Sequence, residues 1–193
     1  VRHFRLVSYW NRGEPTPGTY DFSQLDWQFR KAEAAGAHIT LTVGLRQPRW
    51  PECHAPTWAN TAAPAAQWQP QLEHYITAVV QRYKASPALA DYQLENEYFL
   101  RGFGDCHDFS RERLVAEEQL LRRLDPTRHI VIGRSNNALG TPLGQPTPDE
   151  YSVSVYKRVW DAGVTHRYLE YPFPAWYYGA LAGVQQITRG KPM

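Results

Sequence analysis

The chain has 193 residues, 42% of them hydrophobic, which is enough for the core of one globular domain or of most of a larger one. Acids and bases nearly balance at a formal net charge of +2 without a long basic run, which argues against a nucleic acid or an anionic membrane as partner. No apolar run is long enough to span a membrane, and Val1 opens directly into a strand-like stretch without a signal peptide. Aromatic residues reach 13%, a high share that favours a small or neutral ligand such as a sugar, held by rings that line a groove.

The first half of the chain predicts two strands joined by a helix. Residues 1–10 alternate polar side chains with β-branched and aromatic ones, the pattern of a strand. After a turn-rich stretch, we expect a helix to begin with Ser23 as its N-cap and to stop at Gly36. Residues 38–44 predict a buried strand. The stretch 45–70, rich in proline and tryptophan, cannot be one regular element, and a loop of this length suggests a function.

The second half continues the alternation of helix and strand. Apolar residues at helical spacing between Leu72 and Tyr83 predict a helix that ends before Pro87. The remaining predicted elements are a strand at 88–96, a helix capped by Ser110, strands at 129–133 and 150–156, and a helix at 174–188. Such a βα series predicts an α/β fold with a parallel sheet, either doubly wound or a (β/α)8 barrel.

The unusual residues of the sequence favour the barrel, because they follow the strands. They are Tyr9, Trp10, residues 46–50, Asn96, Glu97 and residues 156–160. In a barrel the chemistry lies at the carboxyl ends of the strands, on one face. The loops that enter the strands are plain, and no glycine-rich phosphate loop follows the first strand, which lowers the case for a nucleotide site.

The two cysteines, Cys53 and Cys106, are each followed by a histidine. A Cys2His2 metal site, a disulfide and two free thiols all remain open, although adjacent ligands are not the usual zinc spacing. Both cysteines follow neighbouring strands, so a disulfide is geometrically reasonable if their Cα atoms lie within about 7 Å. A disulfide would point to an oxidising compartment and therefore to an extracytoplasmic or secreted protein.

Two segments resemble a known group of enzymes. "WNRGEPTPGTYDFSQLD" follows the first strand and "QLENEY" ends a later one, an order and spacing similar to glycoside hydrolase clan A. The second segment closely resembles the acid/base segment of family 35 and family 42 β-galactosidases, and the layout is also similar to family 5 cellulases and mannanases. The loop at 45–70 departs from the family 35 pattern. The resemblance implies a TIM barrel that hydrolyses a β-linked sugar with retention and needs no metal or organic cofactor.

The resemblance also predicts what each site residue does. Glu97 would be the general acid/base, and Asn96 would bond the sugar 2-hydroxyl. Arg5 would support the carboxylate of the nucleophile by charge and hydrogen bonds, and Tyr156 would bond that nucleophile. The competing interpretations are an exposed turn glutamate, an asparagine that forms an Asx turn, an ordinary arginine at a strand edge and a core tyrosine.

Three tryptophans are candidates for stacking on a sugar face. Trp50 lies in the long loop 45–70, where a flat ring could meet the substrate. Trp10 and Trp160 also follow strands, with packing beneath loops as the alternative role.

By the same resemblance, the chain is an incomplete single barrel domain over residues 1–193 that spans strands two to six. The nucleophilic glutamate, at the end of strand seven, is then expected beyond Met193. A retaining enzyme needs two carboxyl groups about 5 to 5.5 Å apart, and Glu95 is a poor second one because it would approach the same face of the sugar as Glu97. The alternative to an enzyme is an inactive fragment or a protein that only binds carbohydrate. Open sheet edges would also favour self-association.

Overall fold

The computed structural model describes residues 1–135, 144–161 and 163–193. Five parallel strands form the main sheet in the order β1-β2-β3-β4-β5, so each strand pairs with the strand before it in the chain. They are β1 (His3–Val7), β2 (His38–Val43), β3 (Leu89–Leu94), β4 (His129–Ser135) and β5 (Glu150–Ser154). The predicted α/β class and parallel sheet are confirmed.

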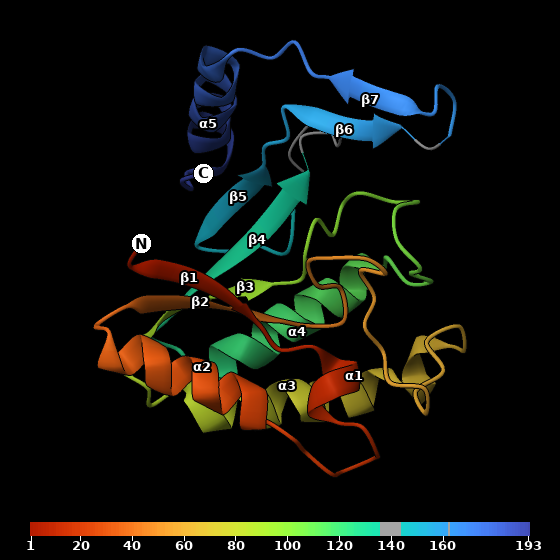
Figure 1. Ribbon diagram of the computed structural model, residues 1–193, viewed down its shortest axis with the longest axis vertical. Helices are drawn as coiled ribbons and strands as arrows, with labels where there is room; N and C mark the ends of the chain where they lie inside the picture. Colours follow the sequence, from red (N-terminus) through yellow and green to blue (C-terminus); the bar gives the residue numbers. More distant parts are fainter. Residues whose placement is uncertain (136–143, 162) are drawn as a thin grey trace.

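Three helices, α2 (Ser23–Ala34), α3 (Gln69–Tyr83) and α4 (Arg111–Leu124), cover one face of the sheet (Figure 1). Two single-turn elements, α1 (Trp10–Gly13) and a 3-10 turn (Ala65–Gln67), lie in the loops that follow β1 and β2. The final helix α5 (Ala175–Arg189) lies near β5, beyond the three covering helices (Figure 1). No helix in the described ranges combines the length and the hydropathy needed to cross a membrane.

The two faces of the sheet differ in polarity because side chains alternate along each strand. Toward the helices, the strands present fully buried apolar residues: Ile39, Leu41, Tyr92, Leu94, Ile130 and Ile132. The other face carries polar residues and is hollowed, with a volume of about 470 Å³. Arg5, Thr40, Asp91, Gln93, Glu150, Ser152 and Tyr156 are among the residues that line this hollow. A sheet with one apolar face and one polar, concave face is ready to hold a polar ligand.

The ends of the sheet are the strands β1 and β5. The C-terminal tail runs beside the start of β5, where the Tyr151 amide donates to the Pro192 carbonyl at 3.0 Å. That contact satisfies one backbone donor at an edge that would otherwise be open.

One predicted helix cap is wrong. Ser23 is the first residue of α2 and not its N-cap, which is Phe22 and forms no capping bond through its side chain. The Ser23 amide instead donates to Asp21 Oδ1 at 2.9 Å, so an aspartate two residues earlier satisfies this donor. The predicted stop at Gly36 holds, with φ +58.

The predicted cap at α4 is correct, and it supports a stability test with a matched control. Ser110 Oγ accepts from the Arg113 amide at 3.3 Å, whereas Ser23 caps nothing. We expect Ser110→Ala to lower the free energy of unfolding by about 1 kcal/mol and Ser23→Ala by a few tenths at most. Urea denaturation followed by circular dichroism measures both; equal losses would contradict the assignment of the caps.

Candidate active site

The turn that follows β3 carries the motif Glu95-Asn96-Glu97 in an unusual conformation. Glu95 and Glu97 have left-handed backbones, with φ +57 and +44, although neither is glycine. All three side chains are buried, with exposed fractions of 0%, 7% and 4%. Left-handed backbone at non-glycine residues costs free energy and clusters at functional sites. The surface-turn interpretation of Glu97 is therefore wrong, because a turn on the surface would leave these polar groups in water.

Glu95 ties this turn to the end of the neighbouring strand β2. Its Oε1 accepts from the Leu45 amide and its Oε2 from the Arg46 amide, each at 2.7 Å. Gly44, with φ +110, leaves room for the Glu95 side chain, because a Cβ at this position would overlap Glu95 Oε1. The ends of β2 and β3 are thus held together by one carboxylate.

The charge of Glu95 is balanced by Arg113 of α4, which donates to Glu95 Oε1 at 2.8 Å. Arg113 also pairs with Glu117 at 2.5 Å and Asp108 at 2.6 Å, and it is 1% exposed. Burial opposes the charge of Arg113, but the carboxylates of Glu117 and Glu95 outweigh it and raise its pKa well above the usual value. Burial raises the pKa of Glu117 well above its ordinary range. Both oxygens of Glu95 are committed to this cluster, so Glu95 cannot serve as the second carboxylate of the reaction.

Glu97 differs from Glu95 in that its carboxyl is not committed. Its Oε1 is buried and has no hydrogen-bond partner in the described part of the chain. A buried acceptor without a donor is costly, and such atoms call for a ligand, a water or a functional role. Two charged groups, Arg46 and Glu52, lie close enough to interact electrostatically with Glu97.

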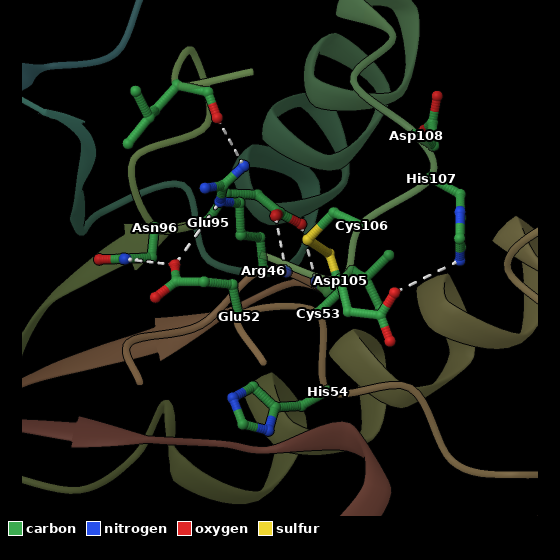
Figure 2. The surroundings of a disulfide bond; sticks show 12 residues. Arg46, Glu52, Cys53, His54, Glu95, Asn96, Asp105, Cys106, His107 and Asp108 are labelled. Carbon is green, nitrogen blue, oxygen red and sulfur yellow. Dashed lines mark hydrogen bonds and ion pairs between the residues drawn. A yellow bond between two sulfur atoms is a disulfide. The ribbon is translucent and has the colours of Figure 1, made fainter. Parts of the chain in front are cut away.

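Glu52 is a site residue that was not predicted from the sequence. It is 5% exposed and accepts from Asn96 Nδ2 at 2.9 Å, while Arg46 Nε lies 3.6 Å from the same oxygen (Figure 2). Burial raises the pKa of the Glu52 carboxyl, whereas the Asn96 hydrogen bond and the Arg46 charge lower it. Burial also lowers the pKa of Arg46. The left-handed backbone of Glu52, with φ +71, has no signature in a sequence.

A disulfide joins Cys53 to Cys106, with Cα atoms 5.3 Å apart, and it links the loops that follow β2 and β3 (Figure 2). The same two loops share a hydrogen bond from the Asp105 amide to the Pro51 carbonyl at 2.9 Å. Gly104 packs so closely that a Cβ there would lie 2.8 Å from Glu52 Cβ. Because their sulfurs are bonded to each other, the cysteines are not available as metal ligands. The described ranges contain no cluster of three His, Cys, Asp or Glu side chains placed to hold a metal ion.

The structure brings two further predicted residues to the hollow on the polar face of the sheet. Arg5 and Tyr156 both line it. Arg5 NH1 donates to Gln93 Oε1 at 3.1 Å, and Gln93 Nε2 in turn contacts Asn96 Oδ1 at 3.4 Å. Arg5 is thus connected to the turn that bears Glu97.

The three tryptophans lie in different surroundings. Trp50 is 70% exposed and meets Phe103 edge to face, with ring centroids 6.3 Å apart, so its ring is open to a ligand. Trp10 is fully buried, and its indole nitrogen donates to Glu14 at 2.7 Å. The prediction that Trp10 stacks on a sugar is therefore wrong: α1 turns the chain inward after β1 and packs the ring against Trp58.

Trp160 does not follow a strand but lies inside one. It belongs to a hairpin of β6 (Arg158–Asp161) and β7 (Arg167–Glu170), packs edge to face on Tyr168, and is not among the residues that line the hollow. This hairpin was not among the elements predicted from the sequence. The β-branched, aromatic and apolar residues in 158–161 and 167–170, with Gly163 between the two segments, are the signal that could have predicted it.

Residues 2–114 match the family model of glycoside hydrolase family 42, described as beta-galactosidase. This is more than half of the chain. The chain belongs to glycoside hydrolase family 42. No curated protein sequence matches it.

Solved structures show that the five-stranded sheet has the fold of part of a TIM barrel. Xylanase 10C from Cellvibrio japonicus, in complex with xylopentaose, matches 68% of this chain with TM-score 0.57 and 18% identity. A β-galactosidase from the psychrophilic Marinomonas ef1 matches 81% with TM-score 0.57 and 15% identity. A family 5 enzyme from Streptomyces cattleya, in complex with GlcNAc, matches 71% with TM-score 0.57 and 13% identity. The family 42 chain spans 29%, 37% and 36% of these three proteins.

The close approach at Gly44 predicts a large effect of a small substitution. Gly44→Ala adds a Cβ in the space of Glu95 Oε1, and we expect it to lower the free energy of unfolding by about 2 kcal/mol or more. Gly36→Ala is the matched control, since Gly36 is also left-handed but has nothing within 4 Å of the added atom. The control should cost about 1 kcal/mol. Equal losses in chemical denaturation would show that Glu95 does not constrain this turn.

The disulfide predicts a redox-dependent stability. It closes a segment with a sequence separation of 53, for which the loss of unfolded-state entropy corresponds to about 4 kcal/mol. Cys53→Ser with Cys106→Ser, or reduction of the native chain, should lower the free energy of unfolding by a similar amount and, with it, the midpoint temperature of thermal unfolding. An unchanged midpoint after verified reduction would contradict this role.

Proposed function

We propose that this family 42 chain is part of a retaining β-glycosidase in which Glu97 is the general acid/base. The observation that carries the proposal is the buried, uncommitted carboxyl of Glu97 at the carboxyl end of β3. In TIM barrels, reacting groups lie at this end of the strands. In its acid form Glu97 would protonate the leaving oxygen, and in its base form it would then activate the water that releases the sugar.

The same mechanism needs a second carboxylate on the other side of the anomeric carbon, about 5 to 5.5 Å from the first. Glu95 is committed to structure, and Glu52 lies on the same rim as Glu97, bonded to its neighbour Asn96. We assign the nucleophile to a glutamate beyond Met193, on a later strand of the barrel. Arg5 and Tyr156 line the hollow and would contact the nucleophile. Arg5 would stabilise the ionised form of its carboxylate.

Two other residues would bind the substrate. Asn96 would donate to the sugar 2-hydroxyl, a contact that strengthens in the transition state. The exposed ring of Trp50 would stack on a sugar face at the rim. A β-linked oligosaccharide or aryl glycoside is the proposed substrate class, with β-galactosides first because the matched family model is described by that activity. Residues 1–193 would form one partial catalytic domain, and the chemistry itself calls for no metal or organic cofactor.

The role of Glu97 predicts a dependence on the leaving group. In a protein that includes the sequence flanking this chain, Glu97→Gln should lower kcat/KM for a phenyl β-galactoside by about 10²- to 10⁴-fold, because protonation of the leaving oxygen is lost. A dinitrophenyl β-galactoside, whose leaving group needs no proton, should lose much less. Rapid mixing should show a burst of dinitrophenolate, since the intermediate then waits for a base.

The control is Glu112→Gln, which removes an exposed carboxylate of α4 and should leave both substrates unaffected. Equal losses on the two aryl glycosides would refute Glu97 as the acid. The 193-residue chain alone should be inactive if the nucleophile lies beyond it. Binding of sugars by the extended protein without any turnover would favour the carbohydrate-binding alternative.

A further inference from the structure

A continuous chain of hydrogen bonds crosses the site from β1 to the loop after β2. Arg5 donates to Gln93 Oε1 at 3.1 Å, and Gln93 Nε2 donates to Asn96 Oδ1 at 3.4 Å and to the Glu95 carbonyl at 3.0 Å. Asn96 Nδ2 then donates to Glu52 Oε2 at 2.9 Å. This series of hydrogen bonds therefore has a cation, Arg5, at one end and a carboxylate, Glu52, at the other.

The direction of these bonds fixes how each amide is turned. A guanidinium only donates, so the oxygen of Gln93 faces Arg5 and its nitrogen faces the Asn96 oxygen. An ionised carboxylate only accepts, so the nitrogen of Asn96 faces Glu52. If either amide were flipped, donors would meet donors or acceptors would meet acceptors in a buried site, which costs free energy.

We propose that Glu52 is a positioning residue that holds the Asn96 amide with its nitrogen toward the sugar subsite. One N–H of this nitrogen is used by Glu52, and the second is presented to the 2-hydroxyl. The inference rests on the proposed function for the sugar contact, but the placement of the amide does not.

The loop around Glu52 is braced as a positioning group requires. Arg46 Nε lies 3.6 Å from the Glu52 carboxylate, and Arg46 NH1 donates to the Leu100 carbonyl at 3.0 Å (Figure 2). The adjacent Cys53 is bonded to Cys106, and Gly104 packs on the Glu52 side chain. Glu52 is therefore held from the side of β2 and from the side of β3, and it can transmit a fixed geometry to Asn96.

The first test reads the Asn96 side chain directly, without any need for turnover. In ¹⁵N-labelled protein, the side-chain NH₂ signal of Asn96, identified by its absence in Asn96→Asp, should shift with pH as Glu52 titrates. The midpoint should lie above the ordinary glutamate value of about 4.3, because burial raises the Glu52 pKa. Arg46 and Glu97 are the other charged groups that act on Glu52, so the titration is repeated in Glu97→Gln.

Glu52→Gln should remove this titration and move the Asn96 signal. Glu118→Gln is the matched control: that carboxylate is also nearly buried, at 6%, and pairs with Arg122 on α4, outside the chain of hydrogen bonds. The control should leave the Asn96 signal unchanged. If the titration persists in Glu52→Gln, the proposal is overturned.

The second test is kinetic and separates positioning from a general loss of structure. With the extended protein, Glu52→Gln should lower kcat/KM about tenfold for an aryl β-galactoside, because a charged acceptor is replaced by a neutral amide that can also turn its nitrogen toward Asn96, and much less for its 2-deoxy analogue. Equal losses on the two substrates would show that Glu52 does not act through Asn96. A protein without any turnover would refute the proposed function, while the NMR titration would still decide whether Glu52 orients the amide.

Discussion

The carboxylate of Glu95 holds the site together, because it satisfies two backbone donors at the end of β2 from the end of β3. Neither Leu45 nor Arg46 belongs to a strand, so their amides would otherwise need water or another partner in a buried place. Arg113, which lies on α4, lowers the cost of burying the Glu95 carboxylate because it neutralises its charge. A buried charge network of this kind contributes little net stability but is costly to break, which suits a role in fixing geometry.

What Glu95 fixes is the turn that carries Asn96 and Glu97. Glu95 and Glu97 differ in their hydrogen bonds. Both carboxylate oxygens of Glu95 accept hydrogen bonds, whereas Glu97 has an oxygen with no partner in the described residues. Both glutamates have a left-handed backbone, but Glu95 pairs with Arg113 of α4, whereas Glu97 Oε1 accepts no hydrogen bond from the described residues. Two like residues, two positions apart, thus receive different roles from the partners that surround them.

Much of this arrangement could be predicted from sequence, because strands and helices follow periodic patterns. The apolar spacing from Leu72 to Tyr83, the cap at Ser110 and the stop at Gly36 all correspond to elements of the structure. The role of Glu52 could not be predicted, because it meets Asn96 across 44 residues and from a loop without periodicity. The burial of Trp10 was equally hidden, since only the turn of α1 decides which way that ring points.

In the proposed mechanism, Glu97, which lies on the turn that Glu95 holds, meets the glycosidic atom of the substrate. The most direct measurement is a crystal structure of the protein, extended by its flanking sequence, with an aryl β-thiogalactoside that binds but is cleaved poorly. We expect the glycosidic sulfur within hydrogen-bond reach of the Glu97 carboxyl, and the Asn96 nitrogen at about 2.6 to 3.2 Å from the 2-hydroxyl. A sugar bound elsewhere, or bound with its glycosidic sulfur turned away from Glu97, would contradict it.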